Sequence, residues 1–265
     1  MKVRNENMIN DTVEPKVKSL YKAMNILNYF NEDNKELGIT EIAQKTGMLK
    51  STVHNIMQTF ECCGFVVQNY DNSKYKLGSS VVELFSKYRD THKMDYRVSE
   101  CLQQIKNKFN VNVYLGVKNK NDVIYLCAEN SFYLKGDYLN KLGARVPLHC
   151  TGIGKILLGY STADEREQYY STELTKYTDN TIVDMNKLKE QIENAVYEGY
   201  ATEYEEMNVG IYSIGVPIII GYDKIEYGIG LASNKPFSEY ELKEYVKELK
   251  YRAKYIGSLL QNYKE

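Results

Sequence analysis

Residues 39–64 encode two short amphipathic helices separated by a glycine, and this spacing limits the local fold more than any other feature of the chain. Thr40 is a suitable N-cap, and Glu41 follows in the first turn, where the helix dipole favours an acid. Gly47 stands where a left-handed residue would end the helix, and Ser51 is placed to cap a second helix. The pattern therefore predicts a helix, a tight glycine turn and a second helix.

The second helix is predicted to have one apolar and one polar face. Its apolar residues recur at i, i+3, i+4 and i+7, and they are Val53, Ile56, Met57 and Phe60. The polar side carries Lys50, Ser51, Thr52, His54, Asn55, Gln58 and Thr59. Such side chains can hydrogen-bond base edges or phosphates, and none of them repels a polyanion. The alternative is an ordinary solvated face, which is usually rich in Glu and Lys, whereas this one has no acid before Glu61. We therefore predict that the polar face contacts DNA.

A β-hairpin is predicted directly after this helix. Two alternating runs, residues 65–67 and 74–78, flank a cluster of turn formers at 69–73. On the second run Lys74 and Lys76 alternate with a tyrosine and a leucine, so one strand face is basic and the other apolar. The predicted use of the basic face is phosphate contact, which supplies affinity without sequence information. A further amphipathic helix ahead of the motif has the apolar residues Leu20, Ala23, Met24, Leu27 and Phe30.

Length and composition allow two globular domains, because the chain has 265 residues, of which 43% are hydrophobic and 26% charged. We expect a disordered tail over residues 1–15, a winged helix-turn-helix domain over 16–78, a linker helix over 79–96 and a second domain over 97–265. The linker contains neither Gly nor Pro, so we expect it to be stiff. The whole chain has a formal charge of −1, which is far from strongly basic, so affinity for DNA must depend on where individual lysines lie.

From residue 97 the pattern changes to mixed helices and strands. Helices are expected over 97–109, from about 151, over 185–198 and over 238–262, and strands over 111–117, 123–128, 212–220 and 227–233, with an extended segment over 139–148. Helices beside an antiparallel sheet predict an α+β fold.

Two groups of motifs carry a family resemblance. The segments SLYKAMNILNYF, GITEIAQKTGMLKSTVHNIMQTFECCGFV and YKLG resemble the winged helix-turn-helix of the IclR family of bacterial transcriptional regulators. The segments VPLHCTGIGKILL and GYATEYEEMNVGIYSIGVP are similar to its effector-binding domain, which has a GAF-like α/β fold. The resemblance covers nearly the whole chain from residue 16. One departure is Asn55, where the family usually has an arginine, so the DNA sequence recognised by this chain should differ.

The resemblance also implies an effector site in the second domain. Matched to the family's motifs, its residues are Gly152, Ile153, Glu203, Ser213, Ala232 and Asn234. Gly152 and Gly154 lie near a helix start, where backbone N–H groups can approach a small anion, but glycines there can equally serve close packing of helix on sheet. Glu203 can equally be a surface acid beside two neighbouring glutamates. Ile153 is larger, and Ala232 less polar, than a pocket for a very small oxo-acid would favour.

Catalysis is not expected. The TGIGKI segment lacks the first glycine of a phosphate loop, where His149 stands, and Ile156 replaces the magnesium-binding Ser/Thr. There is no GxGxxG at the start of a βαβ unit and no GxSxG elbow. The three histidines lack metal-ligand spacing, so neither metal nor cofactor is expected. His149 and Cys150 are adjacent on an extended segment, where neighbouring side chains point oppositely and cannot form a thiol–imidazole pair.

The resulting hypothesis is a regulator that binds a pseudo-palindromic operator in double-stranded DNA as a homodimer, or as a dimer of dimers. Its effector would be a small metabolite, a carboxylate or another polar catabolic intermediate, that changes operator affinity. Five scattered cysteines and the lack of an apolar leader or membrane-spanning run indicate a cytoplasmic protein. The alternative is a winged helix used for protein contacts, with a second domain that only dimerises.

Overall fold

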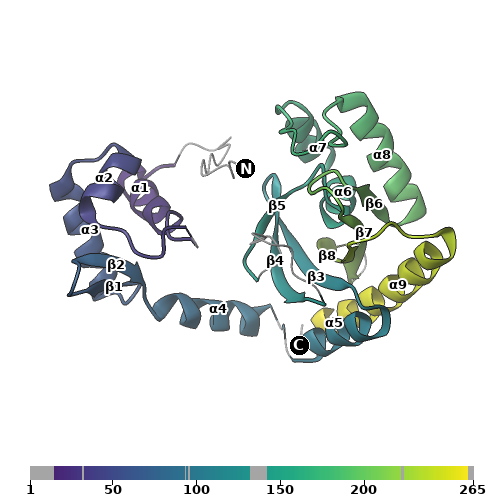
Figure 1. Cartoon of the computed structure of the whole chain (residues 1–265), viewed down its shortest axis with the longest axis horizontal. Helices are drawn as coiled ribbons and strands as arrows, with labels where there is room; N and C mark the ends of the chain where they lie inside the picture. Colours follow the sequence, from purple (N-terminus) through teal and green to yellow (C-terminus); the bar gives the residue numbers. More distant parts are fainter. Residues whose placement is uncertain are drawn as a thin grey trace. The chain divides into compact units, whose positions relative to one another are not determined.

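The computed structural model describes residues 15–31, 33–92, 94, 96–131, 142–221 and 224–261. The chain divides into two compact units, Met1–Thr91 and His92–Glu265, and each is considered separately (Figure 1). Apart from Pro15, the tail expected over residues 1–15 lies outside the described residues, as do residues 139–141 of the expected extended segment.

The first unit is a helix-turn-helix followed by a hairpin. It contains α1 (Lys18–Leu27), α2 (Ile39–Thr46), α3 (Lys50–Cys62), β1 (Val66–Asn69), β2 (Lys74–Leu77) and α4 (Ser80–Thr91). Its core is formed by Ile26, Phe30, Leu37, Ile42, Ala43, Val53, Met57, Phe60, Val66 and Tyr75. Leu37 and Tyr75 exchange two backbone hydrogen bonds of 2.9 Å, so the chain ahead of α2 also pairs with the hairpin.

The turn between α2 and α3 is built as the sequence predicts, but the N-caps are not. Gly47 is the left-handed C-cap of α2, with φ of 69°. At the other end Gly38 is the N-cap and Thr40 lies inside the helix, because the Glu41 carboxylate accepts the backbone N–H of Gly38 at 2.6 Å. Helix α3 begins at Lys50 without a side-chain cap, so Ser51 lies in its first turn and the predicted cap there is wrong.

The helix expected ahead of the motif is present as α1, with Ala23, Leu27 and the following Phe30 packed on the core, but two details of the flanking helices differ from the prediction. Leu20 and Met24 of α1 are 58% and 48% exposed, because the helix turns Ile26, its one buried residue, toward the core instead. Helix α4 ends at Thr91 rather than Tyr96, and none of its side chains is buried. The expected stiff linker is thus a shorter helix that makes little contact with its own unit.

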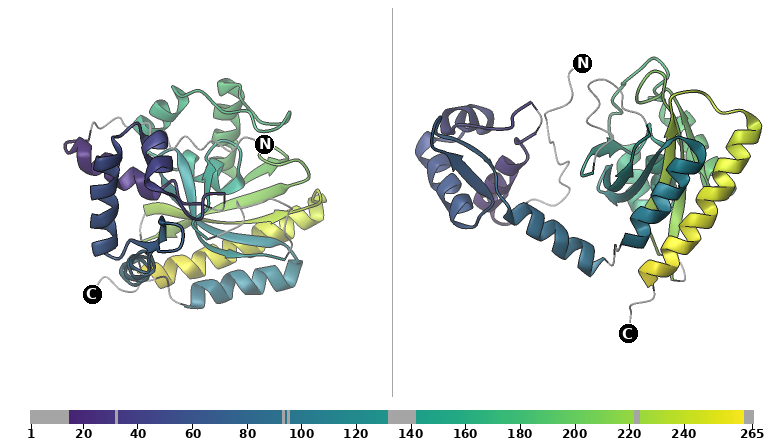
Figure 2. Two further views of the ribbon diagram at one scale, coloured as in Figure 1. Left: turned by 60° about the vertical axis from the view of Figure 1, so that its left-hand side comes forward. Right: turned by 60° about the horizontal axis from the view of Figure 1, so that its bottom comes forward.

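The second unit is a six-stranded antiparallel sheet between helices, which confirms the α+β class. The strand order is β5-β4-β3-β8-β7-β6, and the strands are β3 (Asn112–Asn119), β4 (Asp122–Glu129), β5 (Arg145–Pro147), β6 (Ala201–Tyr204), β7 (Tyr212–Ile220) and β8 (Lys224–Ser233). The helices are α5 (Tyr96–Phe109), α6 (Gly152–Gly159), α7 (Ala163–Tyr170), α8 (Met185–Glu198) and α9 (Glu239–Gln261). Figure 2 shows α5 and α9 side by side along the sheet.

Strand β7 is covered on both faces, and this arrangement positions the polar residues described below. Helix α9 approaches through Gly257, where an added Cβ would lie 2.3 Å from the carbonyl oxygen of Ile219. Helix α6 approaches on the other face, where Gly152 meets Gly215. Sequence patterns missed α7 and β6, because α7 has few apolar residues and β6 has only four residues.

Candidate functional site

Helix α3 presents the predicted polar face to solvent. Val53, Met57 and Phe60 are buried and Ile56 is half-buried, so the opposite side of the helix is free of the core. The exposed residues on that side are Lys50, Ser51, Thr52, His54, Asn55, Gln58 and Thr59. A helix of this diameter fits the major groove of B-DNA.

The hairpin is a wing beside this helix, but its two lysines differ. Strands β1 and β2 pair in antiparallel register, with Gln68 opposite Tyr75. Tyr75 is buried, whereas Leu77 is 42% exposed, so the predicted apolar face of β2 reduces to Tyr75. Lys76 is exposed. Lys74 is half-buried, and its Nζ lies 2.9 Å from Oε1 of Glu41 at the start of α2.

In the second unit a row of side chains crosses one face of the sheet. Glu203 of β6 pairs with Ser213 of β7, Ser213 with Ala232 of β8, and Ala232 with Asn112 of β3. Directly paired residues of antiparallel strands point to the same face, and all of them except Ser213 are buried. Sequence reasoning missed Asn112, although an asparagine at the start of an otherwise apolar strand indicates a polar group buried with that strand. The row brings three of the predicted effector residues, Glu203, Ser213 and Ala232, to one place on the sheet.

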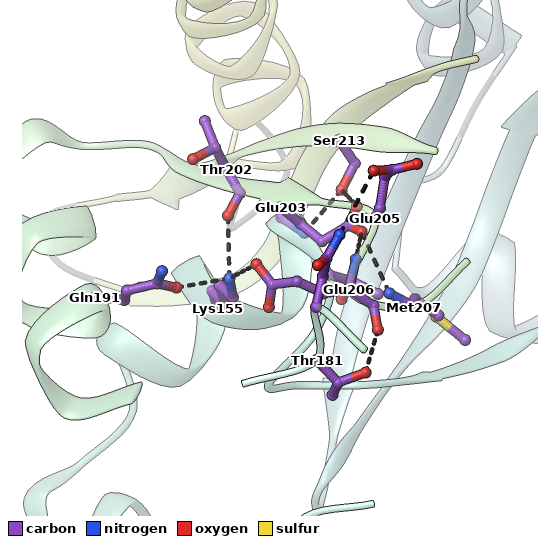
Figure 3. Close-up of polar contacts among 12 residues, drawn as sticks. Lys155, Thr181, Gln191, Thr202, Glu203, Glu205, Glu206, Met207 and Ser213 are labelled. Carbon is purple, nitrogen blue, oxygen red and sulfur yellow. Dashed lines mark hydrogen bonds and ion pairs between the residues drawn. The ribbon is translucent and has the colours of Figure 1, made fainter. Parts of the chain in front are cut away.

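Glu203 is the centre of a hydrogen-bond chain that ends at α6 (Figure 3). Its Oε2 accepts the Ser213 hydroxyl at 2.8 Å, and the Ser213 oxygen accepts the backbone N–H of Gly152 at 3.1 Å. Its Oε1 accepts the backbone N–H groups of Glu206 and Met207 at 2.6 and 3.3 Å. Glu203 is only 1% exposed, which excludes a surface acid. Burial raises the pKa of its carboxyl to about 7, against the effect of these hydrogen bonds.

A buried ion pair adjoins Glu203 (Figure 3). Lys155 of α6 is 1% exposed, and its Nζ donates to Glu206 Oε1 at 2.5 Å, to Gln191 Oε1 at 2.7 Å and to the carbonyl of Thr202 at 3.2 Å. Glu206 Oε2 is buried and has no hydrogen-bond partner among the residues that the structure describes. Burial raises the pKa of Glu206, and Lys155 opposes this rise. The ammonium therefore bonds only one of the two buried carboxyls, that of Glu206, and its three protons are all donated, whereas Oε2 of Glu206 remains as a spare acceptor.

The glycines of α6 serve close packing, and this favours the second of the two interpretations left open by the sequence. An added Cβ on Gly152 would lie 2.6 Å from the backbone nitrogen of Gly215, which only a glycine avoids. Ile153 packs against the sheet, with its side chain 3.0 Å from the Cβ position of Gly228. The N–H of Gly152 is already donated to Ser213. The N–H of Gly152 at the start of α6 is therefore already hydrogen-bonded within the protein, through Ser213 to Glu203.

Not every predicted effector residue reaches this place. Ala232 is 7% exposed and lies in the row beside Ser213. Asn234 follows the end of β8 and is exposed, so the structure does not bring it together with Glu203. Lys155 and Glu206 were missed, although a lysine inside the apolar helix GIGKILLG is a signal of a buried, paired charge.

His149 and Cys150 do not form a reactive pair. His149 Nε2 donates to the carbonyl of Thr175 at 3.0 Å, so Nδ1 accepts the Tyr169 hydroxyl at 3.1 Å, and burial lowers the pKa of the ring. Burial, with the nearby Glu203, raises the pKa of the Cys150 thiol well above its usual value. The described residues contain no group of three potential metal ligands, and none of the described helices is long and apolar enough to cross a membrane.

Comparison with known proteins gives matches over nearly the whole chain. The KdgR transcriptional regulator of Escherichia coli is 29% identical over 244 residues, which are 91% of this chain and 92% of that protein. The IclR regulator of Alicyclobacillus acidocaldarius has a similar structure, with a TM-score of 0.80 at 21% identity over 93% of this chain and 100% of that chain. An IclR homologue of Microbacterium hydrocarbonoxydans, solved with 4-hydroxybenzoate, has a TM-score of 0.78 at 20% identity over 91% and 98% of the two chains.

Two family descriptions match consecutive parts of the chain. Residues 19–69 match the IclR helix-turn-helix domain, and residues 87–258 match the C-terminal domain of bacterial IclR transcriptional regulators. The relatives are transcriptional regulators, which disfavours a winged helix used only for protein contacts. The chain therefore belongs to the IclR family and is a transcriptional regulator with a helix-turn-helix DNA-binding domain and a C-terminal effector-binding domain.

Proposed function

We propose that the exposed face of α3 enters the major groove of a pseudo-palindromic operator while the wing lies along the phosphates. The face combines a lysine with short hydrogen-bonding side chains, among which Asn55 can pair with adenine N6 and N7. The single observation that carries this proposal is that all seven polar residues predicted for the face, Lys50 to Thr59, are exposed together while the apolar stripe is buried. The proposed domain limits are 16–78 for the DNA-binding domain, 79–96 for the linker segment that contains α4, and 97–265 for the effector-binding domain.

Two copies of the chain would bind together. Exposed large apolar side chains gather on the two helices that flank the DNA-binding motif: Val17, Leu20 and Met24 on or beside α1, and Val81, Val82 and Leu84 on α4. Exposed apolar patches of this kind typically mark a surface that another protein covers. A second copy supplies a surface of the same composition and doubles the DNA contacts, as a two-fold operator requires. A homodimer, or a dimer of such dimers, is the proposed assembly.

The effector would bind at the polar row of the C-terminal unit, in contact with Ser213, Ala232 and the Glu203 carboxyl. This place is supported by its buried polar atoms and by Oε2 of Glu206, a buried acceptor for which the described part of the chain offers no hydrogen-bond donor. The proposed ligand is a small polar catabolic intermediate, such as a hydroxy acid, because the hydroxyl can donate where the carboxylate cannot. The homologue that holds 4-hydroxybenzoate supports a ligand of this kind. Coupling between effector and operator is typically about 1–3 kcal/mol.

The protein would act in the cytoplasm, where its DNA target lies and where reducing conditions keep cysteine thiols reduced. The test begins with purified full-length protein and fragmented genomic DNA. Selection should enrich a short set of fragments that share a dyad-symmetric motif, and mobility shifts should confirm these fragments one by one. Retention of DNA without any shared motif would contradict sequence-specific regulation by this chain. Substrates and products of the enzymes encoded beside the retained operator would then be tested for release of that operator from the protein.

A further inference from the structure

Two acids, Glu36 ahead of α2 and Glu41 in its first turn, fasten the turn end of the wing. Near the turn, Glu36 accepts the side-chain N–H groups of Asn69 and Asn72 at 3.1 and 2.7 Å. At the start of β2, Glu41 Oε1 accepts the ammonium of Lys74 at 2.9 Å. Next to this ion pair, Leu37 and Tyr75 exchange backbone hydrogen bonds as an isolated bridge. The chain from Glu36 to the first turn of α2 thus holds the turn end of the hairpin against the helix-turn-helix.

The Lys74 side chain runs toward α2 rather than outward from the wing. Its Cγ lies 3.8 Å from the Cβ position of Gly38, so its stem packs on the N-cap, and its ammonium ends at Glu41. Glu41 is itself held, because its other oxygen accepts the N–H of Gly38 at 2.6 Å. The N–H of Gly38 and the ammonium of Lys74 both hold the pKa of the Glu41 carboxyl below its usual value. The Glu41 carboxylate is therefore negatively charged at neutral pH and offsets the charge of the Lys74 ammonium beside it.

Lys76 is in a different position. It lies two residues along the same strand, on the same strand face as Lys74, but it is exposed, and within the described chain no carboxylate lies within ion-pair distance of its ammonium. A phosphate that approached Lys74 would also approach the Glu41 carboxylate, and the repulsion would cancel most of the attraction. Lys76 interacts with the Glu36 carboxylate only beyond ion-pair distance, and that carboxylate is hydrogen-bonded to Asn69 and Asn72. A phosphate that approached Lys76 would therefore meet an ammonium that is not held in an ion pair. The two lysines, which look equivalent in the sequence, are electrostatically unequal.

We propose that Lys74 is a positioning residue, clamped by Glu41 to fix the wing, and that Lys76 is the wing's phosphate contact. This rests on the proposed use of the wing along the DNA backbone. Glu41 then has two roles, because it caps α2 and keeps one positive charge of the wing away from DNA. Its removal should add a phosphate contact, whereas removal of the whole pair should leave the number of contacts unchanged.

The salt dependence of binding counts these contacts, since each phosphate contact contributes about −0.9 to the slope of log K against log[salt]. The probe is a fluorescent 30-bp duplex of random sequence, titrated with full-length protein by anisotropy at several KCl concentrations. Lys76→Met should make the slope shallower by about 0.9 for each protein copy bound. The double variant Glu41→Gln/Lys74→Met, which keeps the net charge, should retain the wild-type slope.

Glu41→Gln alone gives the sharpest readout, because its amide oxygen still accepts the N–H of Gly38 while Lys74 is released. Its slope should steepen by up to about 0.9 per copy. Asp71→Asn, at an exposed acid in the wing turn, is the matched control and should leave the slope unchanged. Thermal unfolding followed by circular dichroism checks that each variant is folded.

The proposal that Glu41 clamps Lys74 is wrong if the slope of log K against log[salt] becomes as shallow in the double variant as in Lys76→Met. It is also wrong if Glu41→Gln and Asp71→Asn change that slope equally. If the double variant does not fold, the salt slopes of Glu41→Gln and Asp71→Asn alone decide whether Glu41 clamps Lys74. Failure of the wild-type protein to bind the duplex at any salt concentration would instead contradict the proposed DNA-binding function. The two failures are therefore distinguishable.

Discussion

Replacement of Glu203 by glutamine should flatten the pH dependence of the unfolding free energy of the C-terminal unit. Burial raises the pKa of the Glu203 carboxyl from 4.5 to about 7, although the Ser213 hydroxyl and the backbone N–H groups of Glu206 and Met207 act in the opposite direction. The folded chain therefore holds a proton at Glu203 over a pH range in which the unfolded chain has released it.

The size and sign of the effect follow from this shift. One pKa unit corresponds to about 1.4 kcal/mol, so the shift at Glu203 corresponds to about 3 kcal/mol. Because the pKa is raised in the folded state, the stabilisation is fully present below the unfolded pKa and is lost as the pH rises through about 7. Roughly 2 kcal/mol of the loss falls between pH ~5.5 and ~8.5. Glutamine keeps an acceptor oxygen and does not ionise, so it avoids this loss.

The assay is urea unfolding of the full chain followed by far-ultraviolet circular dichroism across that pH range. The two units are fitted as separate transitions, since a single two-state free energy is not defined for them together. The stability of Glu203→Gln relative to wild type should increase by about 2 kcal/mol as the pH rises. Glu190→Gln, at an exposed acid of α8, should follow the wild-type curve. Parallel curves for Glu203→Gln and wild type would refute a raised pKa at this site.

Three further outcomes are expected. Gly152→Ala should destabilise the C-terminal unit by about 1–3 kcal/mol in urea unfolding, because its Cβ would lie 2.6 Å from the nitrogen of Gly215; unchanged stability would contradict this packing. Asn55→Ala should cost ~1–3 kcal/mol on the operator and relax preference at one base pair in binding titrations, whereas equal weakening on scrambled DNA would indicate a phosphate contact. In alkylation by iodoacetamide followed by mass spectrometry, the exposed Cys62 should react long before Cys150, whose thiol is buried and has a raised pKa; rapid labelling of both would contradict this burial.

The parts of the fold that the sequence predicted are those determined by local patterns. Gly47 requires a left-handed turn, and the apolar spacing of α3 determines which of its faces is buried, so the helix-turn-helix could be derived except for the N-caps of its two helices. The same holds for α8, whose observed bounds, Met185–Glu198, are those predicted. Where the pattern was weak, prediction failed. Leu20 and Met24 continue an apolar spacing in α1, but nothing in their own unit covers them.

The contacts that define the sites are nonlocal, and the sequence could not supply them. Glu41 and Lys74 are 33 residues apart, so the ion pair that makes the two wing lysines unequal has no local signature. Glu203 stands in an acidic run that is equally typical of a surface loop, and only the pairing of β6 with β7 buries it. The family resemblance placed Glu203 and Ser213 in one site, but it did not indicate Lys155, Glu206 or Asn112.

Whether two copies of α3 bind a symmetric operator is decided by hydroxyl-radical footprinting on a genomic fragment that the protein retains. We expect two protected half-sites related by a dyad, with centres about 10 bp or a multiple of it apart. A single asymmetric half-site that is bound with full affinity would contradict it.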